Sequence, residues 1–228
     1  MLSKKKLIII ITTLIFFALL CNCYLKKEKA INLAKNYLAQ KYEFDSVYRS
    51  CRFSYIDPSQ YIVTFSTNNL LFDVIISSDL KTPSDVIREN YIYVNDDYVL
   101  KRFEFLIYDY LKVNTNGKFN GFISINNQPI YSFKISKYIK TDMKLDELED
   151  LIDYNIYIEI NENALADEIK NIYDTINLVK DNNFTPQSIT ICMENDGVTD
   201  FININNLSEF NSLEDFTNFI YRYKTGDI

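Results

Sequence analysis

A short apolar run near the N-terminus constrains this chain more than any other feature. Residues 4–6 are lysines, and the run that follows, residues 7–20, is interrupted only by Thr12 and Thr13. A positive start before a short apolar core is typical of a secretory signal peptide. A membrane-spanning helix needs roughly twenty apolar residues, and counting on to Leu25 nearly reaches that length, so an uncleaved anchor is the alternative. In both cases the lysines stay in the cytoplasm, and we expect the chain after Leu25 to lie outside it.

The end of the apolar run resembles the bacterial lipoprotein box. In Leu20-Cys21-Asn22-Cys23, the leucine stands three residues before Cys23. The resemblance implies that Cys23 is lipidated and becomes the first residue of the mature chain. Asn22 departs from the pattern, which prefers Gly, Ala or Ser before the cysteine. Cys21 fits less well, because Ala18 occupies its leucine position and bulky Leu20 directly precedes it. The alternative is two chance cysteines at the end of a plain anchor. A lipidated cysteine carries more than one acyl chain, which is what stable anchoring requires.

The composition predicts a folded, acidic protein. The 228 residues are 47% hydrophobic and have a formal charge of −7, which becomes −10 when residues 1–22, with three lysines and no acid, are removed. Such a chain can build a core and is not disordered. An acidic protein without a basic stripe is a poor candidate for nucleic-acid binding and is repelled by anionic lipid. The length allows one large or two small domains.

Hydrophobic periodicity predicts an α+β fold, with a signal or anchor helix over residues 1–22 and two units over 23–113 and 114–228. We expect each unit to be a small antiparallel sheet packed against helices. In the first unit the expected elements are a helix over 26–42, strands over 47–55, 61–66 and 70–77, and a helical segment from Thr82 to about Leu111, for which a break near residues 95–97 is the alternative. In the first strand Val47 and Cys51 should share a face, and the other two strands should form a hairpin around residues 68–69. In the second they are strands over 119–125, 155–160, 187–194 and 199–205, and helices over 144–151, from a cap at Asn163 to about Asn182, and from a cap at Ser212. Tyr157 should lie on the opposite face of its strand from the isoleucines at 156, 158 and 160.

Two stretches of the chain resemble known bacterial proteins. Residues 29–38 (KAINLAKNYL), followed by strands, resemble the PepSY and cystatin-like domains of secreted bacterial proteins. Residues 72–81 (FDVIISSDLK) and 185–191 (TPQSITI) are similar to stretches in uncharacterised membrane-anchored proteins of low-GC Gram-positive bacteria. This second resemblance implies a location and no catalytic activity. PepSY domains are thought to restrain peptidases, but no motif in this chain carries that property over.

The sequence excludes several kinds of catalytic site. It contains no histidine, which removes Ser-His-Asp and Cys-His nucleophiles and every histidine-containing metal site. After lipidation only Cys51 and Cys192 remain, each among strand-like residues, and we expect both to be free thiols in the core; a disulfide between them is the alternative. We therefore predict no catalytic residue, no cofactor and no metal ligand.

Some short patterns have a structural explanation that we favour. Residues 78–81 (SDLK) and 224–226 (KTG) match two motifs of penicillin-recognising enzymes, but the third motif is absent, which indicates chance. The residues of one acidic cluster fall at helical spacing and would diverge, which favours a solvated face over a calcium site: Asp146, Glu147, Glu149, Asp150 and Asp153. Three further acids flank a hairpin tip, where turn chemistry explains them: Glu194, Asp196 and Asp200. Three tyrosines fit the core pattern less well and are candidates for lining a groove: Tyr91, Tyr93 and Tyr98.

These observations lead us to expect a non-enzymatic lipoprotein of the cell membrane, with its domains facing outside the cytoplasm. Its role would be to bind or restrain a protein partner in the envelope. One alternative is an envelope enzyme that uses carboxylates, with glycan as its substrate. Another is a single-pass membrane protein that serves as a spacer or assembly factor.

We predict that Cys23→Ala leaves the precursor without lipid, whereas Cys21→Ala does not, because only Cys23 has a leucine three residues before it. Metabolic labelling with an alkyne fatty acid measures the outcome. Equal labelling of both variants and the unaltered chain would contradict the assignment.

Overall fold

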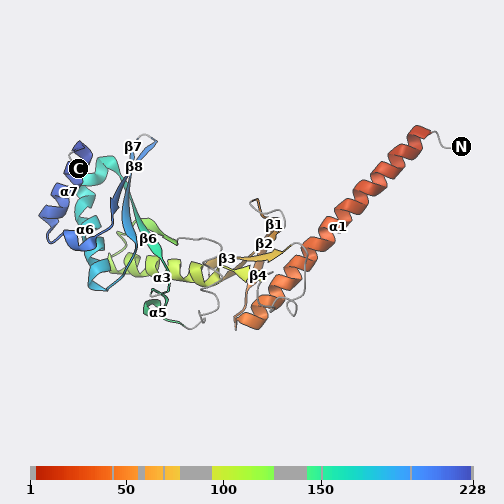
Figure 1. The fold of residues 1–228 in the computed structure, drawn as a ribbon, viewed down its shortest axis with the longest axis horizontal. Coiled ribbons are helices and arrows are strands. Elements are labelled where there is room, and N and C mark those ends of the chain that lie inside the picture. The colour runs from red at the N-terminus through yellow and green to blue at the C-terminus, as the bar shows by residue number, and fades with distance from the viewer. Residues whose placement is uncertain are drawn as a thin grey trace. The chain divides into compact units, whose positions relative to one another are not determined.

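The computed structural model describes residues 4–42, 44–55, 60–68, 70–77, 94–125, 143–149, 151–195 and 197–226. The chain forms two compact units, Met1–Tyr98 and Val99–Ile228 (Figure 1). The first unit begins with an apolar helix, and each unit contains one small sheet with helices packed against it. The α+β class that the periodicity predicts is therefore confirmed.

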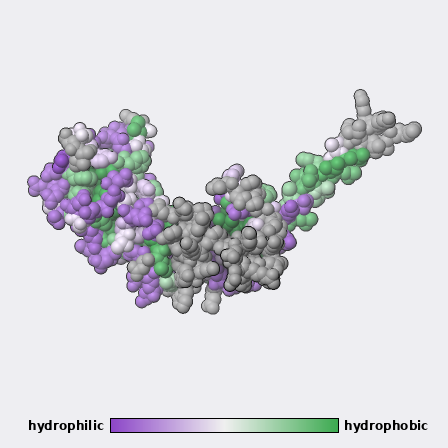
Figure 2. Space-filling model, in the orientation of Figure 1, coloured by the Kyte–Doolittle hydropathy of each residue, from purple (hydrophilic) through white to green (hydrophobic). Residues whose placement is uncertain are grey.

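One continuous helix, α1 (Lys4–Lys41), connects the apolar run to the first unit. Its side chains from Ile10 to Leu25 are exposed, and they form the hydrophobic stretch that Figure 2 shows in green. Beyond Lys29 the helix is amphipathic, and a stripe of residues is buried in the first unit: Ala30, Ile31, Leu33, Ala34 and Leu38. The helix predicted over 26–42 is confirmed. Among the described residues, α1 is the one helix long and apolar enough to cross a membrane, by length and composition alone.

The first sheet lies against the buried stripe of α1. It contains β1 (Val47–Phe53), β2 (Gln60–Thr67), β3 (Leu70–Ser77) and β4 (Val94–Asp96), in that spatial order and antiparallel throughout. Alternate residues of β2 and β3 form the core with α1: Tyr61, Val63, Phe65, Phe72, Val74 and Ile76. The predicted hairpin between β2 and β3 is confirmed, and Asn68 takes the left-handed backbone conformation (φ 45°) that its turn requires.

Strand β1 departs from its predicted alternation. The pairing with β2 shifts register between Tyr48 and Ser50, which marks a bulge at Arg49. The extra residue reverses the alternation, so Tyr48 and Cys51 both pack against the core. The prediction that Val47 shares a face with Cys51 is wrong, because Val47 lies before the bulge and points outward with 56% of its surface exposed.

Helix α3 (Tyr98–Asn114) belongs with the second unit, apart from its first residue. Its aromatic side chains contact rings of that unit: Phe103 meets Tyr154, and Tyr110 meets Phe184. The structure therefore divides the chain after Tyr98, whereas the sequence-based boundary follows residue 113, at the other end of α3. The helix start predicted at 82–85 lies outside the described residues. A continuous helix from there to Leu111 is wrong, because residues 94–96 form strand β4, which was not expected, and α3 begins only at Tyr98.

The second sheet has the order β5-β6-β7-β8. The strands are β5 (Gly121–Ile125), β6 (Tyr154–Asn161), β7 (Ser188–Asn195) and β8 (Val198–Ile204). All four expected strands are present, but the expected antiparallel sheet is wrong in one pair, since β6 and β7 run parallel. Helix α6 (Leu165–Asp181) connects them, and such a crossover returns the chain in the same direction.

Helices cover one face of this sheet. In Figure 1, α6 and α7 (Leu213–Thr225) lie along the same side of its strands. Ile169, Ile172 and Ile176 of α6 are buried, as are Phe216 and Ile220 of α7. The sheet side chains that face them are also buried: Ile156, Ile158, Ile160, Ile189, Ile191, Ile202 and Ile204. Tyr157 points to the opposite face, as predicted from its place between the isoleucines.

The helix caps agree with prediction in one case and differ in the other. Ser212 caps α7, and its hydroxyl accepts a hydrogen bond from the Asp215 amide at 3.1 Å. Asn163 does not cap α6, because a short 3-10 turn, η1 (Glu162–Ala164), precedes that helix and is capped by Asn161. The remaining short helices are α5 (Leu145–Glu149), which was expected, and η2 (Leu207–Glu209).

We predict that Ile172→Ala lowers the free energy of unfolding of the second unit by about 2–5 kcal/mol. The Ile172 side chain is only 1% exposed, and its truncation leaves a cavity between α6 and the sheet. Ile172→Asp should prevent this unit from folding. Hydrogen exchange of the β6 and β7 amides during urea denaturation measures the loss. Leu178→Ala, on the same helix but half-buried, is the matched control and should cost less. An equal cost for both alanine variants would mean that α6 is not docked through Ile172.

Candidate functional site

The candidate site is the face of the second sheet that is opposite α6 and α7. No described helix or strand covers this face, which we call the open face. Strand register and alternation place its side chains in rows across the sheet. The residues of the open face are Phe122, Ser124, Asn155, Tyr157, Glu159, Asn161, Ser188, Thr190, Cys192, Glu194, Thr199, Phe201 and Asn203. Hydrogen bonds between side chains support this assignment: Thr190 donates to Asn203 at 2.8 Å, and Ser188 donates to Asn155 at 2.9 Å.

Large aromatic side chains lie on the open face with much of their surface exposed. Phe122 and Phe201 are 43% and 51% exposed. The rings of Phe122 and Tyr157 stack, with centroids 4.6 Å apart and planes only 5° from parallel. Gly121 allows this arrangement, because a Cβ atom there would lie 1.9 Å from the Tyr157 carbonyl oxygen. A close approach of β5 to β6 thus places Phe122 beside Tyr157.

The same face carries a hollow with two carboxylates. Its volume is about 270 Å³, and its lining includes Asn120, Glu159, Asn161, Cys192, Glu194 and Thr199. Glu159 lies opposite Cys192 in the register of β6 and β7, and Glu194 lies one row further along. Both glutamates are exposed, and neither carboxylate has a hydrogen-bond or ion-pair partner among the described residues. The open face, as defined by its residues, contains no lysine or arginine, so it is acidic as well as aromatic.

Cys192 forms part of the floor of this hollow. It is 9% exposed, and burial, followed by the nearby charge of Glu159, raises the pKa of its thiol. A protonated thiol is a weak nucleophile. Cys192 is a free thiol, as is Cys51 in the first unit, in agreement with the predicted free cysteines.

Sequence reasoning missed this grouping. It assigned Glu194 to a hairpin turn and did not single out Glu159, whereas the structure brings both to one hollow. Asp200 lies on β8 opposite Met193 and not in the hollow, and Asp196 is outside the described residues. The alternation of Tyr157, Glu159 and Asn161 with buried isoleucines was the available signal, since it places those polar side chains on one face.

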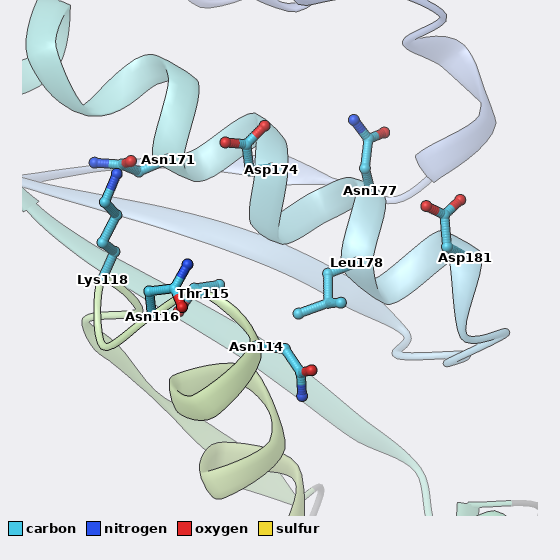
Figure 3. A pocket seen from close by; sticks show the side chains of 9 residues that line it. All are labelled: Asn114, Thr115, Asn116, Lys118, Asn171, Asp174, Asn177, Leu178 and Asp181. Carbon is cyan, nitrogen blue, oxygen red and sulfur yellow. The ribbon is translucent and has the colours of Figure 1, made fainter.

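A second hollow, lined mainly by polar side chains, lies between the loop after α3 and helix α6 (Figure 3). It measures about 260 Å³ and is lined by Asn114, Thr115, Asn116, Lys118, Asn171, Asp174, Asn177, Leu178 and Asp181. Several of these lining residues form the turn that ends α3. In that turn the Thr115 hydroxyl donates to the Leu111 carbonyl at 2.7 Å and accepts from the Phe119 amide at 2.9 Å. The lining on the loop side is therefore explained by the turn, and the hollow is the weaker candidate.

The first unit contains a buried carboxylate, Asp96 on β4, whose side chain is 1% exposed. One oxygen accepts hydrogen bonds from the Tyr37 hydroxyl at 2.6 Å and the Lys41 ammonium at 2.7 Å. The other accepts from the Tyr42 hydroxyl at 2.6 Å and the Tyr98 amide at 3.1 Å. Each carboxylate oxygen therefore accepts two hydrogen bonds. The cluster holds the end of α1 against β4, and its acceptors are already used within the protein.

The environment of Asp96 keeps the two tyrosines protonated. Burial, and then the negative charge of Asp96, raises the pKa of both Tyr37 and Tyr42 far above the usual value. In the unfolded chain these hydroxyls ionise near pH 10. Above that pH the unfolded state therefore binds fewer protons than the native state. The contribution to stability is present below about pH 10 and is lost as the pH rises further.

Tyr98 belongs to an aromatic cluster in this unit and not to a groove. Its ring centroid lies 5.0 Å from that of Tyr42, 4.6 Å from that of Phe44 and 5.1 Å from that of Phe72. The suggestion that Tyr98 lines a groove is therefore wrong. The other two tyrosines of that suggestion, Tyr91 and Tyr93, lie outside the described residues.

One residue of the acidic cluster, Glu149, and one of the 224–226 match, Lys224, have structural roles. Glu149 turns inward and accepts a hydrogen bond from the Tyr154 hydroxyl at 2.6 Å, whereas Asp146 is exposed. Within the described ranges, no group of acids and cysteines is arranged to hold a metal ion. Lys224 forms an ion pair with Glu162 at 2.6 Å, while Ser78 of the other motif falls outside the described residues.

Comparisons of this chain with protein-family models, with curated proteins and with solved structures found no match.

We predict that Asp96→Ala destabilises the first unit by about 3–5 kcal/mol, because it removes the acceptor that the Lys41 ammonium and the hydroxyls of Tyr37 and Tyr42 share. Hydrogen exchange of the β2 and β3 amides, followed by mass spectrometry, reports on this unit separately from the second. Asp45→Ala, which removes an exposed carboxylate from the same unit, is the control and should change little. Unchanged exchange in Asp96→Ala would show that α1 docks without this cluster.

Proposed function

We propose that this protein is a membrane-anchored, extracytoplasmic and non-enzymatic binding protein, whose partner is another component of the envelope. The open face of the second unit is its binding surface. The observation that carries the proposal is the exposure of Phe122 and Phe201 on a sheet whose other face is fully packed. Exposed apolar patches on folded domains are typical of interaction sites.

The N-terminal helix supports the anchoring part of the proposal. The apolar stretch of α1, from residue 7 to Leu25, is about 28 Å long at 1.5 Å per residue, close to the thickness of a bilayer core, and its side chains from Ile10 onward are exposed. Cys23, the proposed lipidation site, is exposed near the end of this stretch. Either a retained helix or a lipid on Cys23 would anchor the protein, with the rest of the chain outside the cytoplasm.

The charge distribution supports the orientation. Residues 1–98 contain twelve Lys and Arg and ten Asp and Glu, whereas residues 99–228 contain twelve and twenty-one, for a net charge of −9. Nearly all of the acidity therefore lies in the unit that follows the anchored one. An anionic membrane surface repels this second unit, which keeps its surface available to partners from the envelope.

A carboxylate-dependent enzyme is the second candidate, and the pair Glu159 and Glu194 is the observation in its favour. Glycosidases use two carboxyl groups, one of which acts as an acid because an apolar pocket surrounds it. Both glutamates here are exposed side chains at an open hollow, which suits the binding of a charge better. Release of reducing ends from cell-wall glycan, abolished in both Glu159→Gln and Glu194→Gln, would favour the enzyme. A spacer or assembly factor would need no open face at all.

We predict that the full chain is found in the membrane fraction and that protease added to intact protoplasts removes a C-terminal epitope tag. The physical reason is that the lysines at residues 4–6 are retained on the cytoplasmic side of the apolar stretch. Immunoblotting with and without detergent measures the cleavage. A cytoplasmic tagged protein serves as the control for protoplast integrity. Protection of the tag until detergent is added would place the domains inside and refute the proposal.

A further inference from the structure

We propose that the open face binds a cationic polypeptide segment, in which lysine or arginine side chains stand beside aromatic or aliphatic ones. This inference rests on the proposed function and specifies the chemistry of the partner. The face offers two different kinds of contact within a few residues: the carboxylates of Glu159 and Glu194, and the exposed rings of Phe122 and Phe201.

The charge of the face selects a cation. Glu159 and Glu194 are on neighbouring parallel strands, and Asn161, the register partner of Glu194, adds a neutral carboxamide. Because the described residues of the open face include no lysine or arginine, none of them neutralises these carboxylates. An ammonium or guanidinium group entering the hollow would meet two acceptors, and the net charge of −9 on the surrounding unit would steer it there.

The aromatic side chains select a partner that also has apolar groups. Phe201 stands in the same row as Glu159 and Cys192, so a side chain beside the hollow would meet its ring. The stacked pair of Phe122 and Tyr157 occupies the next row. A free cation or a purely polar basic segment would leave these rings uncovered, whereas an alternation of basic and apolar side chains would cover both.

The same charges argue against other occupants. A second copy of this chain, docked by a two-fold axis, would bring the four glutamates of two identical faces together. Nucleic acid and anionic lipid are repelled for the same reason. A neutral glycan would stack on the rings but would gain little from unpaired carboxylates, so it is the alternative that the experiment must distinguish.

The test measures peptide binding to the full chain in nanodiscs of neutral phosphatidylcholine. The probe is a short fluorescent peptide of alternating Lys-Lys and Tyr-Tyr pairs, and fluorescence anisotropy gives its affinity. One comparison peptide has glutamate in place of lysine, and another has serine in place of tyrosine. An oligomer of N-acetylglucosamine, measured by calorimetry, represents the neutral glycan. Empty nanodiscs correct for binding to lipid.

We expect the Lys-Tyr peptide to bind more tightly than either comparison peptide, and about 0.5 M salt to weaken it. The double variant Glu159→Gln with Glu194→Gln should lower its affinity about tenfold. The matched control is Asp174→Asn with Asp181→Asn, which removes the same charge from the polar hollow beside α6 and should leave the affinity within about twofold. Phe201→Ala should also weaken binding, whereas Phe105→Ala, an equally exposed ring (50%) on α3, should not.

Three results would overturn the assignment. Equal losses in the two double variants would mean that the unit attracts cations through its net charge alone. Equal losses in Phe201→Ala and Phe105→Ala would mean that the aromatic part of the open face is not used. Binding of the glycan together with no binding of the Lys-Tyr peptide would mean that the partner is a glycan and not a cationic polypeptide. Because the nanodisc assay does not depend on which side of the membrane the domains occupy, its failure is distinct from failure of the protease experiment.

Discussion

The hydrogen bonds to the Asp96 carboxylate hold the first unit together at the point where its separate segments meet. The acceptor lies on β4, and the donors come from the last turn of α1, from Tyr42 just after it and from the first residue of α3. Burial of a carboxylate is costly unless every oxygen is engaged, and this arrangement satisfies that condition. The docking of the apolar helix onto the first sheet therefore depends on a polar interaction as much as on the apolar stripe from Ala30 to Leu38.

In the second unit the main constraint is that a sheet has two faces and the helices cover only one of them. The covered face is filled by isoleucines, and the open face by aromatic, carboxamide and carboxylate side chains. A solvated sheet face usually carries polar residues throughout. Here Phe122 and Phe201 depart from that pattern next to Glu159 and Glu194. The combination gives the surface a chemical preference that neither the rings nor the acids would provide separately.

Much of this fold could be predicted from periodicity, because burial imposes it on each element separately. The alternation of Ile156, Ile158 and Ile160 with polar residues predicts β6 and its buried face from this local stretch alone. Periodicity does not report pairing, so the parallel arrangement of β6 and β7 was missed. It also fails where one residue is inserted, as at Arg49 in β1. The open face was not predictable, because alternation shows that two faces differ but not which residues lie together across strands.

The continuity of α1 has a consequence for how the protein would sample its surroundings. Leu25 is 65% exposed and Ala30 is fully buried, so the apolar stretch and the first unit are separated by about 7 Å of helix. A helix of this kind does not bend freely, in contrast to the flexible linkers that let tethered domains explore a large volume. If the apolar stretch stands in the bilayer, the first unit is left with rotation about the membrane normal and lateral diffusion. Encounters with neighbours would then be confined to a thin layer above the lipid, at a nearly constant height.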